Sequence, residues 1–237
     1  MNAVCEKGSR AAVAPSEASV DRDAALAAEC RARADMYGLV ARAYRTEADE
    51  ELLDRLGKIP ATAADDGSDI GRGLSLMSSY AASAWEGTLT ELAVDYVRTF
   101  IGNGVDGHEA AYPFESVYTS EKHLMMQDAR DEVLAIYLSE GLARSSEWKV
   151  GEDHVALEFE FMQTLAARTA DALEAGDRQE AWRLVSVQRN FLHDHIANWV
   201  GRLASDMRSC SRTDFYRGLA WVTDGLVAAD AEYLRGV

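Results

Sequence analysis

Apolar side chains recur every three or four residues along most of this chain, and that spacing is the strongest constraint on its fold. The clearest case runs from Leu89 to Ile101, where apolar residues occupy positions i, i+3, i+4, i+7 and i+8. This period places them on one face of an α-helix. No segment alternates apolar and polar residues between turn signals, as a half-buried strand would. Amphipathic helices without a sheet can bury their apolar faces only against one another, so the pattern predicts an all-α, bundle-like fold.

Helix boundaries follow from the same pattern together with capping residues and glycines. We expect a disordered lead-in over residues 1–20, which show no helical stripe, and one all-helical domain over residues 21–237. A loop is predicted over Gly57–Gly73, because the segment holds Pro60, four glycines and several aspartates. The predicted helices are Asp21–Arg45, Glu50–Leu56, Leu74–Trp85, one beginning near Leu89, Glu121–Glu140 ended by Gly141, one capped by Asp153 and ended by Gly176, one carrying Ala181, Leu184, Gln188, Phe191, His195, Trp199 and Leu203 on a single stripe, and a last one carrying Phe215, Leu219, Val222, Leu226, Ala229 and Tyr233.

The overall charge argues against a nucleic-acid partner. Forty Asp and Glu against 24 Lys and Arg give a formal charge of −16, whereas affinity for phosphate backbones comes from Lys and Arg that displace counterions. An acidic surface attracts basic ligands, although it can also serve solubility alone. No run approaches the ~18 consecutive apolar residues of a membrane span, and residues 1–20 hold no continuous apolar export segment. Three widely spaced cysteines without C-x-x-C are typical of reduced thiols, so we expect a cytoplasmic protein without membrane insertion.

The sequence contains neither a dinucleotide-binding motif in the required structural context nor the usual metal-binding motif of a helical bundle. Residues Gly102–Gly107 match G-x-G-x-x-G, but a predicted helix precedes them where a dinucleotide site needs a strand, so we interpret them as a loop. A metal in a helical bundle usually requires Glu-x-x-His, and no Glu in this sequence has a His three residues later. His193 and His195 would point about 200° apart on a helix. We therefore predict no metal and no cofactor, with His195 as a hydrogen-bonded core histidine.

Asp153 and His154 are an adjacent acid and imidazole that we expect to be exposed at a loop-to-helix junction. Asp153 is a suitable N-cap, and His154 would then be a solvated residue of the first turn. The pair could also serve acid–base chemistry, but no G-x-S-x-G nucleophile elbow is present. The residues alone leave open a structural cap, a small helical hydrolase that uses His154, and a ligand-binding role.

Five short motifs occur in a fixed order in this sequence. They are Asp95–Gly102 (D-Y-V-R-T-F-I-G), Glu115–Tyr118 (E-S-V-Y), the Gly141–Leu142 pair after a helix, Glu152–His154 (E-D-H) and Phe191–Trp199 (F-L-H-D-H-I-A-N-W). Together they resemble the TorD/DmsD family of redox enzyme maturation chaperones, over roughly residues 21–234. The chain departs from the family pattern at Thr99, where leucine is usual before Phe100, and at Gly151, where proline is usual before Glu152.

This resemblance implies a cytoplasmic, all-helical chaperone rather than an enzyme. Such chaperones bind the twin-arginine signal peptide, and often the apo form, of a molybdopterin-dependent oxidoreductase of the dimethyl sulfoxide reductase type, and delay its export until the cofactor is inserted. For Phe100 we expect an ordinary core position. A homodimer is compatible with the resemblance, and a helical regulatory adaptor without a signal-peptide client is a further alternative. The positions that the resemblance ties to client recognition are Tyr96, Phe100, Glu115, Ser116, Tyr118, Asp153 and His154.

Overall fold

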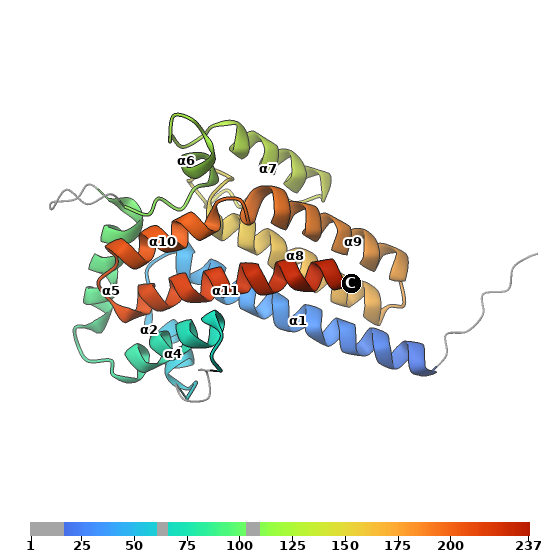
Figure 1. The fold of residues 1–237 in the computed structure, drawn as a ribbon, viewed down its shortest axis with the longest axis horizontal. Coiled ribbons are helices and arrows are strands. Elements are labelled where there is room, and N and C mark those ends of the chain that lie inside the picture. Colours follow the sequence, from blue (N-terminus) through green and yellow to red (C-terminus); the bar gives the residue numbers. More distant parts are fainter. Residues whose placement is uncertain (1–16, 61–65, 103–109) are drawn as a thin grey trace, which may run out of the picture.

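The computed structural model describes residues 17–60, 66–102 and 110–237, and these residues form the helical bundle of Figure 1. Within them no β-strand occurs, and one isolated bridge joins Phe114 to His154. The predicted all-α fold is therefore confirmed. The helices are α1 Glu17–Arg45, α2 Glu50–Gly57, α4 Asp69–Ala82, α5 Thr88–Tyr96, α6 Glu115–Thr119, α7 Asp128–Ser139, α8 Val155–Glu174, α9 Arg178–Phe191, α10 Val200–Cys210 and α11 Asp214–Gly236, with π-helical turns η1 Val97–Ile101 and η2 Leu192–Ile196.

The core lies between long helices that are distant in sequence. Helix α1 packs along α8, α8 along α9, and α11 along both α4 and α10 (Figure 1). Tyr37 and Tyr44 of α1 are fully buried against Phe159 of α8. Their hydroxyl groups keep partners inside the core, because Tyr37 donates to Asp230 at 2.7 Å and Tyr44 lies 3.0 Å from the Thr223 hydroxyl. Among the described helices, none is long and apolar enough to cross a bilayer.

Helix α1 begins before its predicted start. It is helical from Glu17, so the predicted disordered lead-in is wrong for residues 17–20, and the rest of that lead-in lies outside the described residues. The physical reason is that Glu and Ala favour the helix strongly enough to extend it without an apolar stripe. The far end agrees with the prediction, since α1 ends at Arg45.

The segment predicted as a loop over Gly57–Gly73 contains the start of α4. Ser68 caps this helix by accepting a hydrogen bond from the Gly71 amide at 3.0 Å. Gly71 and Gly73 are buried in its first turns, where α4 crosses α11. A β-carbon on Gly73 would lie 2.5 Å from the carbonyl oxygen of Gly218. Gly73 therefore permits close contact between α4 and α11, and the prediction of a loop through this glycine was wrong.

Two π-helical turns interrupt stripes that were predicted to be continuous. In η1 the extra residue per turn rotates Val97 and Ile101 to the surface, where they are 42% and 55% exposed. The predicted single helix through Leu203 is likewise broken at η2, which separates α9 from α10. His195, within η2, and Trp199, which follows it, both remain buried.

Helix α7 is shorter at its N-terminal end than predicted. Helix α7 begins at Asp128 rather than Glu121, and the preceding residues form turns. Its predicted end is confirmed, because Gly141 adopts a φ of 70° that glycine reaches most easily. The G-x-G-x-x-G segment cannot be compared beyond Gly102, since residues 103–109 lie outside the described part of the chain.

Candidate functional site

The structure brings four of the seven predicted site residues together where α6 and α8 begin. Asp153 accepts hydrogen bonds from the Glu115 amide through its carbonyl oxygen at 2.9 Å and from the Ser116 amide through Oδ2 at 3.1 Å. His154 follows directly and forms the isolated bridge with Phe114. All four predicted residues are at most 5% exposed. These contacts therefore fix the first turn of α6 against the start of α8.

Asp153 is not the N-cap of α8, and it is not exposed, so both predictions for it were wrong. Its side chain is fully buried and turns back toward α6. The first amides of a helix have no partner within that helix, and an Asp oxygen is a suitable acceptor for them. Asp153 thus accepts from the first turn of α6, a helix that was not predicted from the sequence.

His154 occupies the N-cap position that was assigned to Asp153. Its Nδ1 atom accepts a hydrogen bond from the Ala156 amide at 3.1 Å. The ring packs edge-on against Phe114 and Trp148, with centroids 4.9 and 5.1 Å away. Burial lowers the pKa of His154 to about 3, and the charge of Arg45 adds to this effect. A solvated first-turn histidine was predicted, whereas the observed side chain is a buried, neutral imidazole.

Three buried carboxylates gather beside this junction. Glu115 meets His195 with 3.2 Å between Oε2 and Nδ1, so the prediction of a hydrogen-bonded core histidine is confirmed. Burial raises the pKa of Glu115 against the opposing effect of His195. Burial also raises the pKa of Glu158 well above its usual range, and the charges of Glu115 and Asp153 raise it further. Burial and the neighbouring carboxylates therefore both favour the protonated form of Glu158.

Glu158 is not among the predicted site residues, although its position in an apolar stripe indicates a buried carboxyl group. It lies on the same helical face as Val155 and Met162, both fully buried, so it interrupts an apolar stripe. Both of its carboxylate oxygens are enclosed without a hydrogen bond of good geometry, as is Oδ1 of Asp153. Within the described residues, no three His, Cys, Asp or Glu side chains are arranged to hold a metal ion.

Tyr96 and Phe100 form a separate aromatic group on α5 and η1. Tyr96 donates its hydroxyl to the Tyr44 carbonyl oxygen at 2.9 Å, and its ring lies 5.0 Å from that of Phe100. Phe100 is buried and meets Tyr44 and Tyr216 edge-on. The expectation that Phe100 is an ordinary core residue is confirmed.

Tyr118 links α6 to α10 and is half-buried. Its ring stacks on Trp199 with centroids 5.4 Å apart, and its hydroxyl donates to Asp206 at 2.9 Å. Five of the seven predicted residues are therefore buried, and Tyr96 and Tyr118 are partly accessible. The surfaces next to these seven residues are therefore more accessible than most of the residues themselves.

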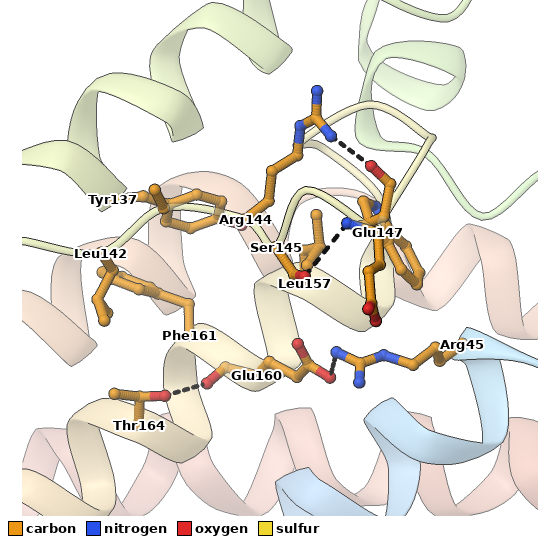
Figure 2. Close-up of a pocket in the computed structure, with 12 residues that line it drawn as sticks. Arg45, Tyr137, Leu142, Arg144, Ser145, Glu147, Leu157, Glu160, Phe161 and Thr164 are labelled. Carbon is orange, nitrogen blue, oxygen red and sulfur yellow. Dashed lines mark hydrogen bonds and ion pairs between the residues drawn. The ribbon is translucent and has the colours of Figure 1, made fainter.

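One such surface is a groove of about 330 Å³ between α7, α8 and the loop that joins them (Figure 2). Tyr137, Leu142 and Phe161 give it an apolar side, and Arg45 pairs with Glu160 across from them (Figure 2). The motif residue Glu152 supports its loop by pairing with Arg130 and Arg144 at 2.6 Å each. Trp148, which contacts His154, also lines this groove.

The second surface is a hollow of about 590 Å³ formed by α6, α7, η2 and the turn after α6, here named the acidic pocket. Among the described residues that line it, Lys122 is the one cation. Glu115 is the buried acid of the pocket and contacts His195, whereas the other acids that line it are exposed. The carboxylates that line it are Glu115, Glu121, Asp128, Glu132 and Asp194.

Comparison with known proteins places this arrangement in a family. The model for the nitrate reductase delta subunit family matches residues 64–205, which is more than half of the chain. The chain belongs to this family. The match spans all five motifs in full and includes the whole junction of α6 with α8.

Several relatives of this family member are named chaperone protein TorD. The Photobacterium profundum protein is 26% identical over 146 residues, which cover 62% of this chain and 65% of the relative. The Shewanella pealeana protein is 23% identical over 218 residues, 86% of this chain and 90% of the relative. The Aeromonas salmonicida protein is 28% identical over 145 residues, 61% of each. These matches confirm the resemblance to TorD/DmsD chaperones.

The departure of this family member at Gly151 has a structural reason. A β-carbon at position 151 would lie 2.7 Å from Oδ1 of Asp153. A proline there would carry such an atom and push the carboxylate away from the Ser116 amide of α6. At the second departure, Thr99 is buried with its hydroxyl unpaired, while its carbonyl oxygen accepts from the Ala111 amide at 2.8 Å. We find no compensating contact for that hydroxyl among the described residues.

Proposed function

We propose that this chain is a cytoplasmic chaperone that binds the twin-arginine signal peptide and apo form of a molybdopterin-dependent oxidoreductase of the dimethyl sulfoxide reductase type. In this role it assists cofactor insertion and delays export, as a monomer or a homodimer. The family and the names of the relatives support a chaperone role rather than an enzymatic one. The observation that carries the peptide-binding part is the acidic pocket next to the Glu115–Tyr118 motif.

The acidic pocket suits the charged part of such a peptide. Arginine carries a planar cation that pairs with carboxylates, and four of the carboxylates that line the pocket are exposed. Exposed ion pairs contribute about 0.2 to 1 kcal/mol each, whereas micromolar affinity needs about 8 kcal/mol. The acidic groups therefore orient the peptide, and burial of its apolar segment supplies most of the affinity.

The hydrolase that was left open as an alternative finds little support. His154 is neutral and buried, and its Nδ1 lone pair is used by the Ala156 amide. Within the described chain, no Ser, Thr or Cys side chain hydrogen-bonds to that ring, whereas an activated nucleophile needs such contact with its base. A regulatory adaptor without a signal-peptide client is separated from the proposal by the binding experiment below.

A calorimetric titration with the leader peptide of a molybdoenzyme from the same genome tests the proposal. We expect micromolar binding with a negative heat-capacity change, because apolar surface is buried. The double variant Glu132→Gln/Asp194→Asn removes two charges from the acidic pocket and is expected to weaken binding about 2- to 30-fold, as two exposed ion pairs would. It should also reduce the weakening that added salt causes.

The control for this titration is Glu50→Gln/Asp54→Asn. These acids line another hollow, of about 650 Å³, between α2, α4 and α5. The control makes the same change in net charge, but away from the acidic pocket. It should therefore leave the affinity within about twofold of the wild-type value. Absence of leader binding by the wild-type protein would refute the proposal. Equal weakening by both double variants would refute the acidic pocket as the site.

A further inference from the structure

Three large apolar side chains project from the turn between α6 and α7. Leu124, Met125 and Met126 are 54%, 52% and 64% exposed, and we name these three residues the methionine turn. Exposed apolar residues that gather in one place mark interaction sites more often than single ones do. We propose that the methionine turn binds the apolar segment of a peptide whose arginines lie in the acidic pocket. This inference rests on the proposed function and deepens it.

The methionine turn is continuous with the acidic pocket. Lys122, two residues before the turn, and Gln127, directly after it, both line that pocket, so the turn adjoins the pocket along the chain. An extended peptide advances about 3.3 to 3.6 Å per residue. An apolar segment that directly follows a pair of arginines in the acidic pocket therefore reaches the methionine turn within a few residues. The order of charge and apolarity along the peptide thus matches the order of surfaces on the protein.

Hydrogen bonds from the motif residues hold the methionine turn in place. The Gln127 amide donates to Oγ of Ser116 at 3.1 Å, and the Ser116 amide donates to Asp153. Nδ1 of His123 lies 2.9 Å from the Val117 carbonyl oxygen. This chain of contacts gives buried Ser116 and Asp153 a positioning role. A surface that is already ordered loses less entropy when a peptide binds.

Methionine suits a surface that must accept different apolar segments. Its unbranched, polarizable side chain adapts to irregular partners, and methionine is frequent at promiscuous binding surfaces. The groove beside Trp148 is less suitable for this segment. Its wall carries Arg45 and Arg144 together with Glu147 and Glu160, so it lacks the excess of carboxylates that the acidic pocket offers to the arginines of the same peptide. Its volume of about 330 Å³ is also small for a segment of roughly 7 to 15 apolar residues.

The test compares a double variant of the full chain, Met125→Ser/Met126→Ser, with the wild-type protein in titrations of the leader peptide. Both side chains are more than half exposed, so the core remains intact. We expect at least a tenfold loss of affinity. Val94→Ser is the matched control, because Val94 is an apolar residue of α5 with 65% exposure and does not line the acidic pocket. It should change the affinity less than twofold.

A second peptide, with its apolar segment replaced by Ser and Gly, completes a double-mutant cycle. The double variant should not weaken binding of this peptide further, because the contact that it removes is already absent. Equal weakening of both peptides would overturn the methionine turn as the apolar site. Unchanged affinity in the double variant, with weaker binding in Leu142→Ser, would place the segment in the groove instead.

Two further outcomes separate this inference from the proposed function. If the wild-type protein binds the leader and the double variant binds it equally well, the methionine turn is refuted while the chaperone role stands. If the double variant instead converts a dimer to a monomer in light scattering without changing leader affinity, the turn is a self-association surface. If the wild-type protein does not bind the leader, both proposals fail together.

Discussion

Replacement of Gly73 by alanine is expected to lower the free energy of unfolding by about 3 kcal/mol. The new β-carbon would lie 2.5 Å from the Gly218 carbonyl oxygen and 2.6 Å from the Val222 amide nitrogen. Both are backbone atoms of α11, so relief requires the two helices to move apart rather than a side chain to rotate. For a chain of this length, that loss corresponds to a fall in melting temperature of roughly 6 to 12 °C. Urea unfolding followed by circular dichroism measures it.

Gly201→Ala is the control for this prediction. Gly201 is an exposed residue of α10, and the nearest atom to its added β-carbon is Asp224 Oδ1 at 3.7 Å, an ordinary contact. Alanine favours the helix over glycine, so this variant should gain about 0.5 to 1 kcal/mol. If Gly73→Ala behaved like Gly201→Ala, the close contact between α4 and α11 would be wrong.

Acid should destabilise the protein strongly through His154. Burial depresses the pKa of this side chain from 6.5 to about 3 in the folded state. Between these two pH values the unfolded chain binds a proton at this position and the folded chain does not. Stability from this group is present above pH 6.5 and is lost as the pH falls from 6.5 toward 3. At pH 4 the loss amounts to about 3 kcal/mol relative to pH 7.

The variant His154→Asn isolates this effect. Asparagine caps a helix well and does not titrate, although the contacts with Phe114 and Trp148 are lost at every pH. The difference in unfolding free energy between pH 7 and pH 4 should therefore shrink by about 3 kcal/mol. His193→Asn is the control, because the His193 side chain is 85% exposed. If both variants kept the pH dependence of the wild-type protein, His154 would not be buried in solution.

The helical periodicity was sufficient to predict the fold but not the irregular turns. Apolar stripes predicted the buried faces of α8 and α11, since those faces depend on a regular period. The π-helical turns at Val97 and Leu192 add a residue within a turn, and no sequence pattern signals that addition here. The glycines of α4 were misread because glycine marks both loops and close helix contacts, and only the position of α11 distinguishes the two.

The sequence motifs grouped residues that lie together in the structure, but they did not predict the contacts that those residues make. The motifs identified Glu115, Ser116, Asp153 and His154, which the structure brings together. Their roles depend on contacts between α6 and α8, which are distant in the chain, so local capping rules assigned the cap to Asp153 rather than His154. The acidic pocket escaped prediction for a similar reason, because its carboxylates come from separate elements.

The most direct test of the central claim is the activity of the client molybdoenzyme in cells that lack this chain. The specific activity of that enzyme should fall at least severalfold in the deletion strain and recover when the wild-type chain is supplied. The Glu132→Gln/Asp194→Asn variant should restore less activity at equal protein level, since it binds the leader more weakly. Full activity of every twin-arginine molybdoenzyme in the deletion strain would contradict a maturation role for this protein.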